Sequence, residues 1–233
     1  MYFDFNKKIE KKIWDEGIGT PSIGETNERF LNPKIVIRQS DTRLTATYDE
    51  EGYHCDYNLF TANKLKSSNL DLKYILSILN SKLMTYYVLE KGYLNIKPGK
   101  TPQIRVTDVK ELPIKEAKNQ IPFIRFVNYI LFLKQLFLSN SSDQLIPTYF
   151  EQIINGMVYE LYFPELLKKH NREIIKHLGE LPEFTDNMSD EQKMEICKKV
   201  FERLNDKEHP VRVNLEKMKE EIKEIRIIEG IEN

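Results

Sequence analysis

The hydrophobic pattern of this chain changes its period at about residue 68, and this change limits the folds open to it. Between residues 34 and 62, β-branched and aromatic residues alternate with polar ones, which is typical of strands in a sheet with one buried face. After residue 68, apolar residues recur every three or four positions, which is typical of helices that bury one side. The sequence therefore predicts an α+β fold in which strands precede helices.

The strand region contains three candidate strands, KIVIRQ, RLTATYD and YHCDYNLFTA. The turn sequence DEEG separates the last two, so the three predict a β-meander with one buried and one solvent-facing side. Asp49 to Glu51 in that turn are expected to be solvated. A further short strand is expected at QIRV, residues 103–106.

The helical region begins with one predicted helix over residues 68–91, with Ser68 or Asn69 as its cap and Gly92 ending it. A helix at 121–138 is apolar on most of its circumference, so several neighbours must cover it. A capping box is expected at 189–192. We expect two domains, a β-rich one at 1–116 and a helical one at 117–233.

Composition is that of an ordinary soluble protein, with 40% hydrophobic and 30% charged residues. Cys55 and Cys197 lie far apart in the sequence, which argues against a disulfide framework and suits a reducing cytoplasm. The first residues, MYFDFNKKIEKKIW, lack the apolar core of a signal peptide, so none is expected. The helix at 121–138 carries Arg125 and Lys134, which makes it too polar for a comfortable membrane span.

Motifs of catalysis are missing from the sequence. It contains no GxSxG elbow, P-loop, HExxH or Cys-x-x-Cys. The four histidines show no metal-ligand spacing; His170 and His177 are expected on one helix, two turns apart and facing solvent. Gly17 and Gly19 follow no predicted strand, so we interpret them as part of a flexible loop rather than a nucleotide cradle.

Positive charge is concentrated in the middle of the chain. Residues 57–110 hold nine Lys or Arg against three Asp or Glu, a net charge of +6, whereas the whole chain has −1. The stretch KGYLNIKPGKTPQIRV, residues 91–106, contains no acid and cannot form a helix because of its glycines and prolines. Such a field attracts phosphate, although a solvated basic surface would show the same charge.

The side chains of this basic region suggest individual roles in DNA binding. Lys97 and Lys100 are expected to contact phosphates, because they are flexible point charges. Asn95, Gln103 and Arg105 carry the donors and acceptors that read base edges. Tyr93 is expected either to stack on a base or to pack beneath the loop. Further positive charge on the candidate DNA-binding surface comes from Arg38, Arg43, Lys64, Lys66 and Lys82.

Three stretches together resemble a known family. They are NPKIVIRQSDTRLTATYDEEGYHCDYNLF, YILSILNSKLMTYYV and PQIRVTDVKELPI, and their order resembles the TaqI-like C-terminal specificity domain. This is the target-recognition domain of adenine-specific DNA methyltransferases and of type IIG restriction–modification enzymes. The resemblance covers roughly residues 30–165, and LNSKL followed by LPI some thirty residues later is its most specific part.

The resemblance implies that this chain recognises DNA for a catalytic domain located elsewhere. In such enzymes an upstream domain binds S-adenosylmethionine and carries an Asn-Pro-Pro-Tyr motif, whereas Asn32-Pro33 is here followed by Lys34. No cofactor is therefore expected in this chain, and its expected partners are double-stranded DNA and an N-terminal methyltransferase domain or subunit. The loop between LNSKL and LPI is expected to read bases.

Two other functions remain open from the sequence. The first is a protein-interaction module that uses the apolar helix 121–138 and the acidic C-terminal helices. The second is a complete enzyme whose site has no recognisable motif.

Overall fold

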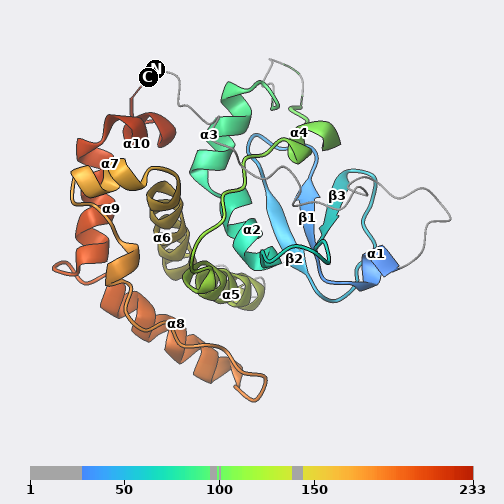
Figure 1. Cartoon of the computed structure of the whole chain (residues 1–233). Coiled ribbons are helices and arrows are strands. Elements are labelled where there is room, and N and C mark those ends of the chain that lie inside the picture. Colours follow the sequence, from blue (N-terminus) through green and yellow to red (C-terminus); the bar gives the residue numbers. More distant parts are fainter. Residues whose placement is uncertain (1–27, 95–98, 100, 138–143, 233) are drawn as a thin grey trace. The chain divides into compact units, whose positions relative to one another are not determined.

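The computed structural model describes residues 28–94, 99, 101–137 and 144–232. Two compact units are present: residues 1–80 with 84–118 form the first, and residues 81–83 with 119–233 form the second. The first contains a small sheet with helices, and the second contains helices (Figure 1). The α+β class predicted from the change of period is confirmed.

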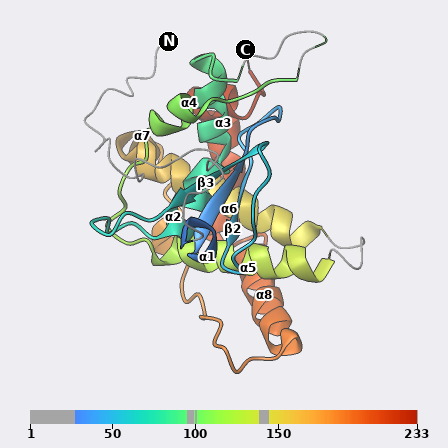
Figure 2. The same cartoon turned by 90° about the vertical axis from the view of Figure 1, so that its right-hand side faces the viewer.

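The sheet of the first unit has three antiparallel strands in the order β2-β1-β3. They are β1 at Lys34–Arg38, β2 at Ala46–Asp49 and β3 at Leu59–Asn63, and Figure 2 views them from the side. The predicted meander is wrong, because a meander would place β2 in the middle. The connection 50–58 instead returns from the end of β2 to start β3 beside Arg38.

The central strand β1 is buried on both of its faces. Ile35 and Ile37 are fully buried on one face, and Lys34 and Val36 are buried on the other. The expectation of one wet face therefore fails for β1. A central strand is enclosed by its neighbours and by the segments that cross it, and its almost continuous apolar run fits that position.

Four helices belong wholly or mainly to the first unit: α1 at Glu28–Leu31, α2 at Leu72–Leu79, α3 at Lys82–Glu90 and α4 at Val106–Lys110. The single helix predicted over 68–91 is interrupted after Leu79, and its cap is Asp71, which accepts a hydrogen bond from the Lys73 N–H at 2.7 Å. The Asn80 amide bonds both backbone groups of Ala46, at 2.8 and 2.9 Å. This pairing fixes the end of α2 to β2 and explains the interruption.

The basic loop, residues 95–100, lies between α3 and α4 in the sequence. Gly92 has a φ of +69° and the chain leaves the helix there, as predicted, because glycine adopts this conformation without steric cost. The strand predicted at 103–106 is wrong: Gln103 forms one bridge with Ser40, and Val106 already begins α4. The Asp108 carboxylate accepts a hydrogen bond from the Arg105 N–H at 3.2 Å, which favours a helix start at this point.

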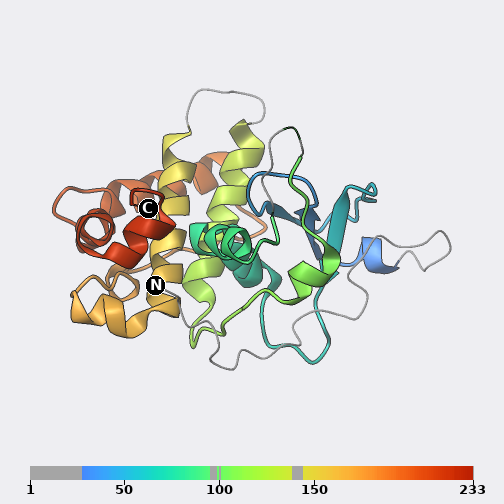
Figure 3. The same ribbon diagram turned by 90° about the horizontal axis from the view of Figure 1, so that it is seen from above.

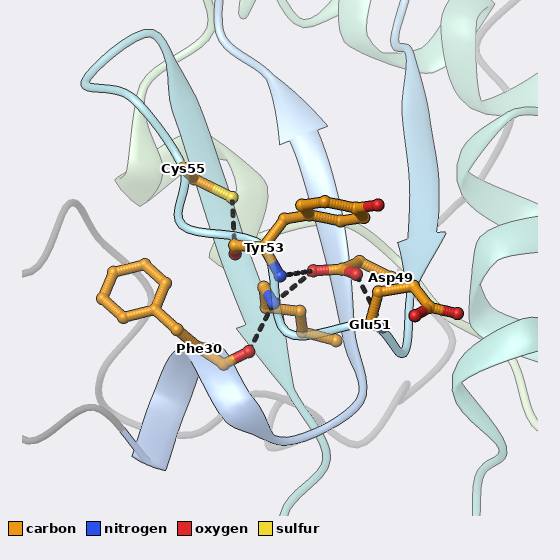
Figure 4. Close-up of polar contacts among 6 residues, drawn as sticks. Phe30, Asp49, Glu51, Tyr53 and Cys55 are labelled. Atoms are coloured by element: carbon orange, nitrogen blue, oxygen red, sulfur yellow. Dashed lines mark hydrogen bonds and ion pairs between the residues drawn. The ribbon is translucent and has the colours of Figure 1, made fainter.

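The buried side chain of Lys34 holds the beginning of β1, and its partners Phe30 and Asp49 are labelled in Figure 4. Lys34 has no exposed surface, and its ammonium group donates to the Asp49 carboxylate and, at 2.6 Å, to the Phe30 carbonyl. Asp49 also accepts hydrogen bonds from the backbone N–H groups of Glu51 at 3.0 Å and Tyr53 at 3.1 Å. The solvated turn expected here is wrong for Asp49, which is buried. Its carboxylate links β1, β2 and the start of the connection 50–58.

The second unit is built from helices (Figure 3). They are α5 at Ile121–Phe137, α6 at Leu145–Tyr162, α7 at Pro164–Lys169, η1 at Ile175–His177, α8 at Asp190–Leu204, α9 at Pro210–Glu221 and α10 at Lys223–Ile228. His170 ends α7 and His177 lies in η1, so the expectation that both share one helix is wrong. The predicted capping box of Ser189 and Gln192 is confirmed.

The core of the second unit is an aromatic cluster between α5 and α6. The Phe150 ring lies 5.3 Å from Phe126 and 5.7 Å from Tyr129, measured between centroids. Phe184 lies 5.1 Å from Tyr129, whose hydroxyl donates to the Pro182 carbonyl. The helix α5 is therefore covered on more than one side within this unit, as its apolar circumference requires.

The described residues lack two features that would bear on function. Among the helices that the structure describes, none is both long and apolar enough to cross a membrane. The same residues contain no group of three or more His, Cys, Asp or Glu arranged to hold a metal ion. Both cysteines are free thiols.

Candidate nucleic-acid interface

Three segments far apart in the sequence meet where β1 ends. The Gln39 N–H donates to the Asn58 carbonyl, and the Gln39 carbonyl accepts from the Ile104 N–H, both at 3.0 Å. The Arg38 N–H bonds the Thr45 carbonyl at 2.9 Å across the β1–β2 turn. We call residues 38–45, 56–58 and 101–105 the hairpin end; the β1–β2 turn and α4 lie at the same end of the sheet in Figure 1.

The β1–β2 turn carries two of the predicted arginines. The Arg38 side chain is 62% exposed and lies 3.4 Å from the Asp41 carboxylate. Burial alone would raise the pKa of Asp41, but hydrogen bonds from Thr45, the Thr42 N–H and Arg38 outweigh it and lower this pKa. Asp41 thus stays charged and organises the turn, while its contact with Arg38 is long. Arg43 is exposed and has no ion-pair partner among the described residues.

Arg105 is held in one orientation by its neighbour Asp108. The guanidinium donates from Nε and Nη2 to the two carboxylate oxygens, each at 2.9 Å. The Arg105 side chain is 76% exposed, whereas Asp108 is 6% exposed. Two of five N–H groups are used by this pair, so the others remain available to an acceptor outside the protein. A fixed, exposed guanidinium has the geometry that reads paired acceptors.

Tyr93 lies beside the loop and is half-buried. Its ring meets Tyr87 edge-on with centroids 6.2 Å apart, and Tyr87 itself is buried. Burial raises the pKa of Tyr93, and the Glu111 and Asp108 carboxylates raise it further. The Tyr93 hydroxyl therefore stays protonated at neutral pH. Gln103, which follows the loop, is exposed.

The other predicted residues do not join the hairpin end in the described structure. Lys64 and Lys66 are exposed, but they follow Asn63, which pairs with Lys34 at the opposite end of the sheet. Lys82 belongs to the second unit, where it forms an ion pair with Glu229. Asn95, Lys97 and Lys100 lie outside the described residues, as do the predicted glycine loop and all of residues 1–27.

Two exposed residues of the hairpin end were missed from the sequence. Tyr57 is 72% exposed, and Asn58 is also exposed. Both were assigned to a strand by the alternation of YHCDYNLFTA. The sequence Asp56-Tyr57-Asn58 could have indicated a turn here, since Asp and Asn favour turns.

Comparison with known proteins agrees with this picture of the first unit. Residues 2–114 match the family model of the TaqI-like C-terminal specificity domain. The chain is also similar to a protein of Methanocaldococcus jannaschii whose name gives it as a predicted type II restriction enzyme and methyltransferase. The two are 25% identical over 195 residues, which cover 78% of this chain and 16% of that relative. The chain thus spans about a sixth of the relative's length.

Proposed function

We propose that this chain recognises a DNA sequence for a restriction–modification enzyme, because residues 2–114 match the family model of the TaqI-like C-terminal specificity domain. The hairpin end is the contact surface, and the observation that carries this proposal is that the segments bearing Arg38, Arg43, Gln103 and Arg105 meet at one end of the sheet. Exposed arginines bind DNA phosphates and so position the protein on the duplex. Arginine and glutamine side chains also read base edges in the major groove.

We further propose a division of roles within this surface. Arg38 and Arg43 contact phosphates together with Lys97 and Lys100, while Gln103 and Arg105 read bases together with Asn95. Tyr93 supports the loop. Lys64, Lys66 and Lys82 serve as more distant positive charges at most, because their described positions place them away from the hairpin end.

The catalytic part of the enzyme lies in another domain or subunit under this proposal. That partner binds S-adenosylmethionine and methylates adenine, as in adenine-specific methyltransferases or type IIG enzymes, and it acts in the cytoplasm. The relative from Methanocaldococcus jannaschii supports this, because it is much longer than this chain.

The helical second unit is also part of the likeness to the relative. The 195 residues aligned with the relative outnumber the 113 of the family match, so the likeness extends into the helical unit. We propose that the helical unit contacts the catalytic partner. The chain would then use its first unit to bind DNA and its second unit to bind another protein domain.

DNA binding by this chain is expected to weaken steeply as salt rises. The Arg43→Ala variant should bind all duplexes more weakly and reduce the slope of log Kd against log salt by about 1, since it removes one phosphate contact. The measurement is fluorescence anisotropy with duplexes selected from a random library, over a range of salt concentrations. Absence of binding to every duplex, or binding that salt does not change, would contradict the proposed function.

Arg105 is expected to affect specificity rather than general affinity. The Arg105→Ala variant should lose about 1–3 kcal/mol of discrimination at one base pair, while its affinity for unrelated DNA changes little. Repeating the selection with this variant and comparing base preferences at each position measures the effect. A uniform loss across all sequences would place Arg105 among the phosphate contacts instead.

A further inference from the structure

We infer that the turn Asp56–Asn58 is a second DNA-contacting element, in which the Tyr57 ring packs against a base or sugar and the Asn58 amide bonds a base edge. This inference rests on the proposed function and adds residues that neither the sequence prediction nor the family match assigns.

The first ground is position. Asn58 and Ile104 bond the N–H and the carbonyl of the same residue, Gln39, each at 3.0 Å. The turn before β3 and the segment that leads from the basic loop into α4 therefore lie next to each other along one edge of β1. A duplex that contacts Gln103 and Arg105 through their exposed side chains also meets this turn.

The second ground is the rigidity of the turn. The Leu59 N–H bonds the Asp56 carbonyl at 3.0 Å, and the Tyr57 N–H bonds the Asp56 side chain at 2.7 Å. Both bonds fix the backbone that presents Tyr57 and Asn58. A turn whose backbone is ordered before binding loses less conformational entropy when it makes a contact.

The third ground is chemistry. Tyr57 is 72% exposed, which leaves its ring open to a partner, and aromatic rings contribute to nucleic-acid binding by stacking or packing on bases. Asn58 forms no side-chain hydrogen bond within the part of the chain that the structure describes, and a free amide matches the donor and acceptor of adenine. The nearby positive charges of Arg38 and Arg43 favour DNA as the occupant over an apolar protein surface.

The carboxylate of Asp56 lies in the same turn and would repel phosphate. Its contact with the Tyr57 N–H directs it towards the backbone of the turn. This turn therefore contacts bases and sugars rather than phosphates.

The test compares Tyr57→Ala with two matched variants in the full chain. Tyr57→Ala should weaken binding to the selected duplex about 5-fold, the lower end of the range for aromatic rings stacked on unpaired bases, without changing the salt slope, because no charge is lost. Tyr57→Phe keeps the ring and should bind like the wild type. Tyr53→Ala removes a ring of similar exposure, 70%, from the same connection near Asp49, and should also bind like the wild type.

The outcomes separate this inference from the proposed function. If the wild-type chain binds DNA with a steep salt dependence and Tyr57→Ala binds equally well, the inference is overturned and the proposed function stands. Equal losses for Tyr57→Ala and Tyr53→Ala also overturn it, because the effect would then not belong to the hairpin end. If the wild-type chain binds no duplex, both fail. Asn58→Ala should lower the preference at one base pair, and unchanged preferences would remove Asn58 from the contact.

Discussion

Replacing Lys34 with methionine is expected to destabilise the first unit by about 3–5 kcal/mol. The substitution keeps most of the apolar stem but removes the ammonium group that pairs with Asp49. Asp49 is buried, so its carboxylate would lose its positive partner without gaining water. Hydrogen exchange of the β1 amides, measured in the wild type and the variant, reports this loss within the sheet itself.

An exposed lysine provides the control for this substitution. Lys66→Met changes the same chemistry at an exposed position and should alter the stability by no more than about 0.5 kcal/mol. The double variant Lys34→Met with Asp49→Leu should recover part of the loss, because no unpaired charge remains. Recovery should be incomplete, since Asp49 also accepts the N–H groups of Glu51 and Tyr53. Protection of the β1 amides in Lys34→Met equal to the wild type would refute the assigned role.

The second large effect is expected in the helical unit. Phe150→Ala should lower the free energy of unfolding by about 3–5 kcal/mol, because Phe150 is fully buried and lies against Phe126 and Tyr129. The substitution leaves a cavity between α5 and α6 that these rings cannot fill completely. Urea unfolding followed by helical circular dichroism measures the change.

Leu145 on the same helix is the matched control for Phe150. It is 63% exposed, so Leu145→Ala should change the stability by no more than about 0.5 kcal/mol. Similar losses for both variants would contradict the role given to the aromatic cluster, because alanine favours helices and its helix propensity cannot account for a loss.

Local patterns in the sequence were sufficient for the class of fold and for most helices. The period of apolar residues located α5, and the Ser189–Gln192 capping box located the start of α8. Strand order was not accessible in the same way, because alternation shows which residues share a face but not which strand is central. The run Lys34-Ile35-Val36-Ile37 held the available signal, since strands buried on both faces have nearly continuous apolar runs.

The composition of the hairpin end depended on contacts between distant segments. Charge identified Arg38, Arg43 and Arg105, but it identified Lys64 and Lys66 equally, although they follow β3 at the other end of the sheet. The contacts at Gln39 are hydrogen bonds between backbone groups. Every residue type carries these groups, so the sequence does not reveal the contacts. For the same reason the approach of Tyr57 and Asn58 to this end could not be predicted from the sequence.

The basic loop is anchored on both sides by bonds that do not depend on side chains. Before it, the N–H groups of Tyr93 and Leu94 bond the Val88 carbonyl at 2.9 and 3.2 Å; after it, Ile104 bonds Gln39. Lengthening a segment between fixed anchors costs little, about 0.6 kcal/mol for each doubling. The segment between these anchors can therefore change in length and in sequence during evolution while the sheet that carries it stays the same.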